Sequence, residues 1–359
     1  MTKTSIRKIS AVKSARLSKM AVALLGTVPF LAACSGSGTS AKAPFASLYV
    51  ASYAEPDKVI EDVLSAKNTK IEGVTVSNSF TFGDEEAVGL AKDPRKITIE
   101  RLFADDDAGG NQQFIRLTVG TLSVDFTRDD LRGDDGEEYL KKVGLNDDDE
   151  ERTIADLNTF GSILEVGQQI MVPLEYFIRV KDGALGPVND STGYIKGFAI
   201  VGLETKPVDM PKDGTATYDG KATLSLTNKT ETYGIGTDQI RYDGDTNIVA
   251  NFSSGKISGD ISITREQVSD YGNSDTDDDL DGSGKLVIDG SIIENGFAFD
   301  LTANKAAADR LVDLGITDAD AGGAGRFYGT EADAVGGLLS GTSSNYLIDG
   351  IFFGYKDED

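Results

Sequence analysis

Alternating carboxylates in one short acidic stretch are the residues best placed to do chemistry. The stretch NSDTDDDLDGSGK, residues 273–285, contains Asp277, Asp279 and Asp281, followed by Gly282. This pattern matches the start of a calcium-binding loop, in which alternate carboxylates converge on one cation and the glycine allows a sharp turn. The complete loop needs a bidentate Glu at its twelfth position, where this chain has Ile288. The alternative is a solvated hairpin tip, and we expect no cofactor other than calcium.

The absence of histidine removes most other chemistry. The 359 residues include no histidine and one cysteine, Cys34. Ser-His-Asp and Cys-His catalysis, the usual zinc ligands and the commonest haem ligand are therefore excluded. The 59 acidic residues show no carboxylate pair whose spacing singles it out. We therefore expect a protein that is not an enzyme, since only a carboxylate or metal hydrolase would remain.

Cys34 follows a sequence with the features of a secretory signal. Residues 1–33 carry six basic and no acidic residues and end in an apolar run from Met20 to Ala33. The run is too short and one-sided for a membrane span. Leu31-Ala32-Ala33-Cys34 resembles the lipobox of bacterial lipoproteins, which implies diacylglycerylation of the Cys34 thiol, cleavage before it, and acylation of the new amino terminus, as with palmitate. The alternative is an ordinary signal peptide with a chance cysteine.

A lipidated Cys34 would fix the location of the protein. Two or three acyl chains anchor a protein stably, whereas a single chain does not. The mature chain would begin at Cys34 and continue through a small, polar, flexible tether at 34–44. By the same resemblance, Ser35 favours the outer membrane over the inner one. We expect a signal peptide at 1–33 and lipid anchoring to an outer membrane.

The charge of the chain limits its partners. It has 35 basic and 59 acidic residues, and removal of the signal leaves 29 basic and 59 acidic residues, a net charge of −30. Such a surface repels nucleic acid and anionic lipid, so we expect no nucleic-acid partner. It suits a cationic protein partner, and it equally suits simple solubility at an exposed cell surface.

The first part of the mature chain, residues 45–208, mixes helical and strand patterns. Val59, Ile60, Val63 and Leu64 form one helical stripe and predict a helix over 57–68. Apolar residues alternate over 115–119 and 122–126, which predicts a hairpin. Further predicted strands are 70–82, 96–103, 168–181 and 193–205, and the segments 136–145 and 151–160 are predicted to be short helices. The class predicted for this domain is α+β, dominated by antiparallel sheet.

The second part, residues 209–359, has a different sequence pattern. A Pro- and Gly-rich linker at 206–213 leads into short strands separated by Gly turns. Eight or nine strands with one helical stretch, 303–314, favour a closed antiparallel eight-stranded barrel, which leaves no exposed sheet edges. The predicted strands are 215–227, 239–243, 246–252, 256–264, 285–289, 291–302, 323–328, 336–341 and 345–355. The fold class is therefore mainly β.

Five segments of this second part carry a family resemblance. They are TATYDGKATL (215–224), VANFSSGKISGDI (249–261), NGFAFDLT (295–302), GRFYGTEADAVGG (325–337) and IDGIFFGYK (348–356). In order and spacing they resemble the β-barrel domain of transferrin-binding protein B and related surface lipoproteins of Gram-negative bacteria. That family usually has proline after F-Y-G, where this chain has Thr330. One F-Y-G element implies a single handle-and-barrel unit, with 45–208 as the handle by position alone.

The resemblance implies a function without naming the ligand. It implies a non-catalytic surface lipoprotein whose loops, at 228–238, 265–284 and 303–322, bind a protein or an iron or haem source. It also implies transfer to an outer-membrane transporter and export by a surface-lipoprotein translocon. The transferrin-binding loops of that family lie in the other lobe, so transferrin itself is not implied. The alternative is a structural or adhesive surface lipoprotein without a nutrient ligand.

The segment 325–337 itself predicts a structural corner. In a strand that ends at Gly329, Phe327 and Tyr328 point to opposite faces of the barrel wall. Thr330 and Asp333 have the spacing of a capping box around one helical turn. Gly336 and Gly337 then lead into the next strand.

Overall fold

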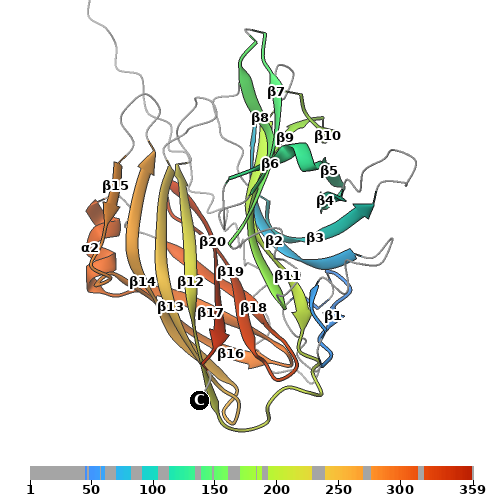
Figure 1. The fold of residues 1–359 in the computed structure, drawn as a ribbon. Coiled ribbons are helices and arrows are strands. Elements are labelled where there is room, and N and C mark those ends of the chain that lie inside the picture. The colour runs from blue at the N-terminus through green and yellow to red at the C-terminus, as the bar shows by residue number, and fades with distance from the viewer. Residues whose placement is uncertain are drawn as a thin grey trace, which may run out of the picture.

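Two antiparallel β assemblies lie side by side in the computed structural model (Figure 1). The structure describes residues 45–357 apart from 47, 57, 61–69, 82–90, 104–112, 134–138, 148, 161–169, 183, 188–192, 229–238, 270–275 and 314–318. The predicted signal peptide, Cys34 and the tether lie outside the described residues. Within the described part, no helix has the length and apolar character needed to span a membrane.

The first assembly, here called the handle sheet, is one curved antiparallel sheet. Its strand order is β6-β7-β8-β9-β11-β2-β3-β4-β5. The short β1 (Ser52–Tyr53) pairs in parallel with the end of β11, and β10 (Ala184–Leu185) pairs with β9. The main strands are β2 (Lys70–Thr81), β3 (Ala91–Phe103), β4 (Gln113–Val119), β5 (Leu122–Phe126), β6 (Leu131–Arg132), β7 (Tyr139–Leu145), β8 (Glu151–Thr159), β9 (Met171–Lys181) and β11 (Gly193–Glu204).

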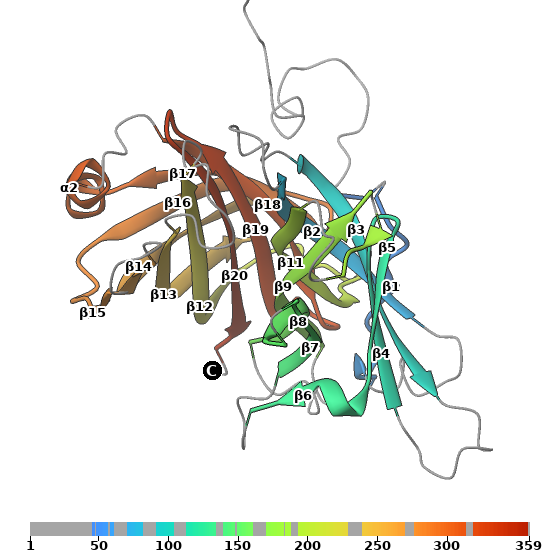
Figure 2. The same cartoon turned by 90° about the horizontal axis from the view of Figure 1, so that it is seen from above.

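Curvature brings the two ends of the handle sheet close together and encloses a core (Figure 2). Lys142 Nζ on β7 donates to the Asp125 carbonyl oxygen on β5 at 3.1 Å. Alternate side chains of each strand fill the concave side, as the predicted alternation in the 115–126 hairpin requires. Fully buried examples are Ile71, Leu117, Phe126, Leu157 and Leu174.

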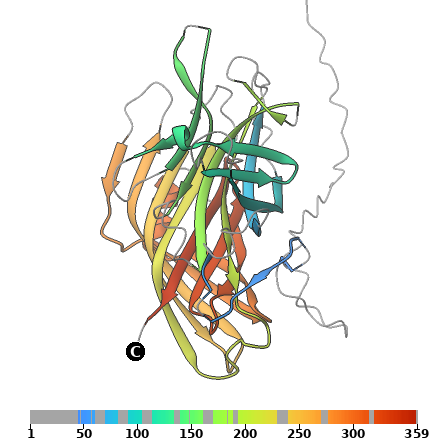
Figure 3. The ribbon, with the colours of Figure 1, turned by 45° about the vertical axis from the view of Figure 1, so that its right-hand side comes forward.

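The prediction of short helices at 136–145 and 151–160 is wrong. These segments form β7 and β8, whose green hairpin projects beyond the end of the barrel (Figure 3). In β8, Ala155, Leu157 and Thr159 are buried at a period of two because the strand pairs with β9, and this pairing overrides helix propensity. The predicted helix 57–68 falls mostly outside the described residues. The α+β class predicted for residues 45–208 is therefore not confirmed, whereas the mainly β class of the chain is confirmed.

The second assembly is a closed barrel of eight antiparallel strands, as predicted, with one short strand added outside the ring. Neighbouring strands pair in chain order, and β20 pairs with β12 to close the ring. The additional β15 (Thr276–Asp279) pairs with the far end of β14. The ring consists of β12 (Thr215–Asn228), β13 (Gln239–Asn251), β14 (Lys256–Ser269), β16 (Lys285–Ile293), β17 (Gly296–Ala303), β18 (Asp320–Tyr328), β19 (Ala334–Thr342) and β20 (Tyr346–Lys356).

Aromatic rings fill the barrel interior. Phe327 lies between the rings of Phe297, Phe252 and Tyr218, at centroid distances of 5.5, 5.7 and 6.1 Å. Phe297, Phe327 and Phe352 are completely buried.

Two of the predicted strand boundaries in the barrel change. The segments 239–243 and 246–252 form the single strand β13, with a register shift at Asp243/Gly244, and 291–302 is divided by a turn in which Glu294 has φ of 56°.

A second apolar layer joins the barrel to the convex side of the handle sheet. It includes Val74, Phe198 and Ile200 from the handle sheet and Tyr328, Leu338 and Ile351 from the barrel. Phe327 therefore points into the barrel and Tyr328 points out of it toward the handle, as the 325–337 segment predicts. The contact is tight: a Cβ on Gly202 would lie 2.6 Å from Cδ1 of Tyr328.

A buried ion pair lies at the end of this interface where the two sheets touch, with Glu204 opposite Tyr328. The Glu204 carboxylate lies 3.4 Å from Nη1 of Arg326, and both side chains are under 5 % exposed. Asn295 bridges the pair, accepting from Arg326 Nη1 at 2.7 Å and donating to Glu204 Oε2 at 3.0 Å. Tyr49 also donates its hydroxyl to Glu204. Charges taken out of water are tolerated only with such partners.

The segment from Leu48 to Ala54, here called the strap, crosses this junction. Tyr49 reaches Glu204, and the Val50 N–H donates to Glu72 Oε2 at 3.0 Å. Lys70 and Lys96 each lie 2.7 Å from Glu72 Oε1. Burial acts to raise the pKa of Glu72, but the hydrogen bonds from Lys70, Lys96 and Val50 outweigh it and lower the pKa to about 2.

We expect Glu72→Gln to destabilise the protein by about 1–2 kcal/mol at pH 7, since both lysine partners are partly exposed and weaken the effect. A depressed carboxyl pKa contributes stability that is present above the ordinary value of 4.5 and is lost as pH falls toward 2. The free energy of unfolding, measured in urea between pH 2 and 7, should therefore depend less on pH in the variant than in the wild type. Glu151→Gln, at the exposed start of β8, is the control. Equal pH profiles for the Glu72 variant and wild type would contradict the assignment.

Candidate functional site

The barrel end farthest from Tyr328 is the candidate site, because the three predicted binding loops belong to it. It is here called the rim. The described parts of these loops are residues 228, 265–269, 276–284, 303–313 and 319–322, and the remaining loop residues lie outside the described residues. The rim therefore consists of the far ends of β13 and β14, the added strand β15, and the helix α2 (Lys305–Asp313).

Both ends of the helix α2 are bound to the barrel, through Asn304 Nδ2 to the Ser283 carbonyl oxygen at 3.0 Å and through Arg310 to Glu266, and Ala307 packs against the barrel core. Its N-cap is Asn304, whose Oδ1 accepts from the Ala307 N–H at 2.9 Å. Near its other end, Arg310 Nε donates to Glu266 Oε2 at 2.9 Å. Glu266 lies opposite Tyr242 in the β13–β14 register, and burial, together with Glu266, raises the pKa of the Tyr242 hydroxyl. The helix predicted at 303–314 is confirmed as this element.

The three carboxylates of the predicted calcium loop lie at the rim but do not converge. Asp277 and Asp279 belong to the extended strand β15, and Asp281 follows it. Asp277 Oδ1 accepts from Arg265 Nε at 2.7 Å, which lowers the pKa of Asp277. Asp281 Oδ1 instead accepts from the Ser283 N–H at 2.9 Å. Among the described residues, no three carboxylate or thiol side chains form a group that could hold a metal ion.

Calcium binding by Asp277, Asp279 and Asp281 stays a prediction, and a thermal melt tests it. A cation that binds only the folded state raises the melting temperature by mass action. Asp277 and Asp281 would have to leave Arg265 and Ser283, so we expect added calcium and chelator to leave the melt unchanged. A rise with calcium that is lost in Asp279→Asn, and kept in Asp289→Asn on the barrel wall, would instead support the loop.

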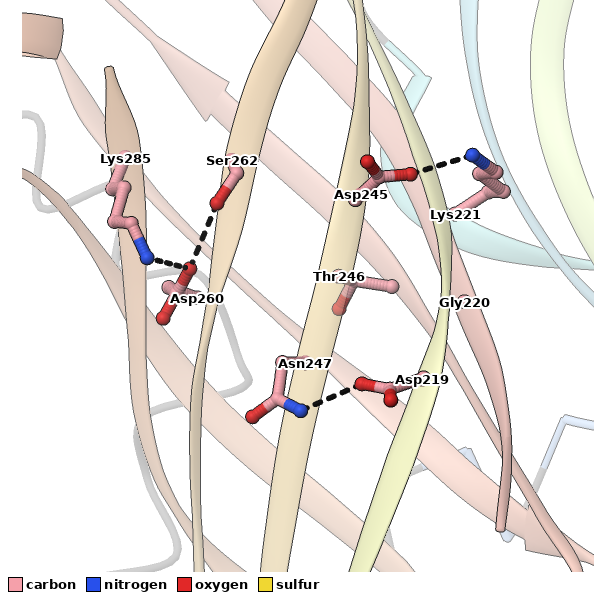
Figure 4. Close-up of a pocket in the computed structure, with 9 residues that line it drawn as sticks. All are labelled: Asp219, Gly220, Lys221, Asp245, Thr246, Asn247, Asp260, Ser262 and Lys285. Atoms are coloured by element: carbon pink, nitrogen blue, oxygen red, sulfur yellow. Dashed lines mark hydrogen bonds and ion pairs between the residues drawn. The ribbon is translucent and has the colours of Figure 1, made fainter. Parts of the chain in front are cut away.

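A polar hollow of about 580 Å³ lies on the outer wall of the barrel (Figure 4). Cross-strand pairs satisfy its charged groups: Lys221 with Asp245 at 2.5 Å and Lys285 with Asp260 at 2.9 Å. Asn247 Nδ2 donates to Asp219 Oδ1 at 2.6 Å. Such pairs stabilise the sheet, and no apolar or aromatic side chain lines the hollow to hold an organic ligand.

Two ion pairs between distant residues were not predicted from the sequence. One is the Glu204–Arg326 pair, and the other joins Glu175 of β9 to Arg241 of β13 at 2.7 Å. Their partners lie 66 residues or more apart in the chain, so no local spacing could reveal them. The sequence offers one signal, an apolar strand pattern interrupted by a charged residue, as Glu175 interrupts the run MVPLEYFI.

Comparison with known families identifies the barrel. Residues 210–356 match the family profile described as the C-lobe and N-lobe β-barrels of transferrin-binding protein B. No curated protein matches the chain.

Solved structures of similar proteins include transferrin-binding protein B of Haemophilus parasuis Hp5 in a double-mutant form. Its sequence is 13 % identical to this one, the alignment covers 81 % of this chain and 76 % of that protein, and the TM-score is 0.34. Transferrin-binding protein B of Neisseria meningitidis serogroup B is 12 % identical, with coverages of 80 % and 77 % and a TM-score of 0.30. The N-lobe of lactoferrin-binding protein B of Moraxella bovis is 12 % identical, with coverages of 61 % and 92 % and a TM-score of 0.31.

Proposed function

We propose that this chain is a non-catalytic binding module of the outer-membrane surface, because its C-terminal barrel is of the transferrin-binding protein B type. It is anchored by lipid at Cys34, carries a handle at 45–208 and a barrel at 209–359, and binds a protein that serves as an iron or haem source. The family match over residues 210–356 is the observation that carries the proposal. The names of the similar solved proteins state that they bind transferrin or lactoferrin.

The rim is the part of the barrel that we assign to ligand binding. It carries exposed side chains, including those of Asp277, Asp278 and Asp279. By contrast, the opposite barrel end is occupied by the strap and by the buried junction at Glu204. Loops held on a rigid scaffold commonly carry binding function. Delivery to an outer-membrane transporter and export by a surface translocon complete the proposal.

A pull-down with defined proteins tests the binding function. The purified mature chain, immobilised, is exposed to transferrin, lactoferrin, haemoglobin and free haem. We expect one of them to be retained and Asp278→Arg at the rim to weaken retention at least about threefold, because a basic ligand surface then meets a reversed charge. Asp289→Arg, the same reversal at an exposed position of β16, should retain the ligand. Failure to retain any of the four would favour the adhesive alternative.

Anchoring and exposure need separate experiments. Cys34→Ser should move the protein from the membrane fraction to the soluble fraction and abolish palmitate labelling, because no other cysteine can carry the lipid. Protease added to intact cells should degrade the wild-type protein. Degradation only after lysis would place the protein on the periplasmic face and would contradict surface exposure.

A further inference from the structure

The barrel end opposite the rim collects the points where the chain enters and leaves the two assemblies. Glu204 at the end of β11 pairs with Tyr328 at the end of β18, and the strap adds β1 beside the same end of β11. A linker, residues 205–214, crosses from there to the start of β12 along the lower end of the molecule (Figure 1). At this end, Tyr355 of β20 pairs with Ala334, the first residue of β19. The strap, the linker and the end of β20 are together called the base below.

Most of the exposed large apolar side chains in the described part of the chain lie at the base. There are six such side chains, and two of them, Leu145 and Val287, lie elsewhere, on β7 and on the barrel wall. Single exposed apolar side chains are ordinary, but their concentration at one end indicates a surface that contacts something apolar. The four at the base are Val50 and Tyr53 of the strap, Val208 of the linker and Tyr355 of β20.

The linker holds Val208 outward by fixed contacts. The Asp209 N–H donates to the Lys206 carbonyl oxygen at 2.9 Å and closes a turn around Val208. Met210, two residues further on, is buried in the barrel core, whereas Val208 is 78 % exposed. The two lysines and two aspartates of the linker leave it without net charge, in a mature chain of net charge −30. The linker is therefore an ordered surface that repels lipid headgroups less than the rest of the molecule does.

The strap presents its apolar side chains in a similar way. Tyr49 donates to the buried Glu204, and the Val50 N–H donates to Glu72 Oε2, so the backbone of the strap is fixed on its inner side. The Val50 side chain is nevertheless 77 % exposed, and the ring of Tyr53 is also exposed. A tyrosine has an apolar ring and a polar hydroxyl, and such side chains are enriched at the headgroup level of membranes.

The length of chain before Phe45 favours the base as the side nearest a membrane. Phe45 is buried between handle and barrel, so a lipid at Cys34 would hold the folded part there. The eleven residues from Cys34 to Pro44 span at most about 40 Å when fully extended. The fourteen residues of β12, tilted as barrel strands are, place the rim about 35 Å beyond the base. Turning the rim to the membrane would use almost this whole length, whereas the base reaches the membrane with length to spare.

We propose that the base is a second, non-covalent membrane contact, in which Val50, Tyr53 and Val208 lie in the headgroup layer of the bilayer that holds the lipid of Cys34. The contact rests on the proposed lipid anchoring. An anchor keeps the base at a high effective concentration beside the bilayer, so a contact too weak to recruit the free protein is sufficient to orient the anchored one. The rim then faces away from the membrane, where a protein ligand can reach it.

Quenching of fluorescence by lipid measures which end meets the bilayer. The chain has no tryptophan, so Tyr355→Trp at the base and Asp278→Trp at the rim each introduce a single reporter. The mature chain is coupled through its Cys34 thiol to a maleimide-bearing phosphatidylethanolamine in phosphatidylcholine vesicles, and brominated phosphatidylcholine is the quencher. We expect the lipid to quench the base reporter at least about threefold more than the rim reporter, because apolar side chains of the base enter the headgroup layer.

A longer tether separates contact from proximity. An insertion of about 20 Gly and Ser residues between Ser40 and Ala41 frees the folded part from the bilayer, and we expect the base reporter to stay quenched. Combining Val50→Asp with Val208→Asp should reduce its quenching to the level of the rim reporter, because two charges would have to enter the headgroup layer. The matched control combines Leu145→Asp with Val287→Asp, which makes the same changes at exposed apolar positions away from the base, and should leave the quenching intact.

Two outcomes would overturn the contact. One is equal quenching of the base and rim reporters on the natural tether. The other is a base signal that disappears when the tether is lengthened, which would show that proximity alone had produced it. Chemical coupling supplies the anchor in these experiments, so either outcome would leave the proposed acylation of Cys34 and the proposed ligand binding at the rim unaffected.

Discussion

Replacing Arg326 by Met should destabilise the protein by about 3–5 kcal/mol, the largest effect we expect from one charged residue. Met keeps most of the volume of the arginine stem but leaves the Glu204 carboxylate, which is 1 % exposed, without its cation. Asn295 also loses the donor to its Oδ1. Urea unfolding at pH 7 measures the loss.

A second substitution separates the cost of an unpaired charge from the value of the pair. Glu204→Gln combined with Arg326→Met should recover at least half of the lost stability, because a neutral amide needs no counter-charge. The control Arg116→Met breaks the exposed pair with Asp125 and should cost less than about 1 kcal/mol. Equal losses for Arg326→Met and Arg116→Met would show that the junction does not depend on the buried pair.

Phe327→Ala should cost a similar amount, about 3–5 kcal/mol, for an unrelated reason. Its ring is completely buried and touches the rings of Phe297, Phe252 and Tyr218. Truncation leaves a cavity that the closed barrel cannot collapse to fill, because each wall strand pairs on both sides. Thermal and urea unfolding measure the loss.

The matched control lies on the outside of the barrel. Tyr355→Ala removes a similar ring from a position that is 41 % exposed, and we expect a loss below about 1 kcal/mol. Phe327→Leu, which fills part of the space, should fall between the two. A loss for Phe327→Ala no larger than that for Tyr355→Ala would contradict the packing described for the barrel interior.

The barrel could be predicted from sequence because each of its strands has a local signal. Alternating apolar residues, as in Ile257, Ile261 and Ile263, mark an inward face that must be buried, and Gly turns separate the strands. The turn at Glu294 was missed because Ile292 and Ile293 continue the apolar run up to it. The register shift beside Gly244 was missed because a bulge depends on the partner strand.

The handle was harder to predict because tertiary pairing decides its structure. Residues 139–145 contain two lysines and a glycine, and residues 151–159 begin with Glu-Arg and include Ala155 and Asp156, so both segments carry residues that are depleted in strands. Both become strands because Leu140, Ala155 and Leu157 complete the core enclosed by the curved sheet. Neither segment shows locally which partner strand it will meet.

The sequence predicted which loops form the candidate site but did not predict the side-chain contacts within it. The position of Asp277 in an acidic stretch is visible in the sequence, but its bond to Arg265 depends on the β14–β15 register. Likewise, Glu175 and Arg241 belong to separate sheets, and their meeting requires both sheets to be folded and packed. A sequence pattern reports periodicity along one element, whereas these sites arise between elements.

The position of the strap determines how a mechanical pull would enter an anchored molecule. Tension on a tether at Cys34 would reach the described structure at Phe45, which is buried in the apolar layer between handle and barrel, and then at the strap, where Val50 is bound to Glu72 and Tyr49 to Glu204. The load is thus shared between the handle and the junction before it reaches the barrel wall. Such a pull would strain this N-terminal segment first, while the closed ring of eight strands, in which each strand pairs on both sides, would keep its shape.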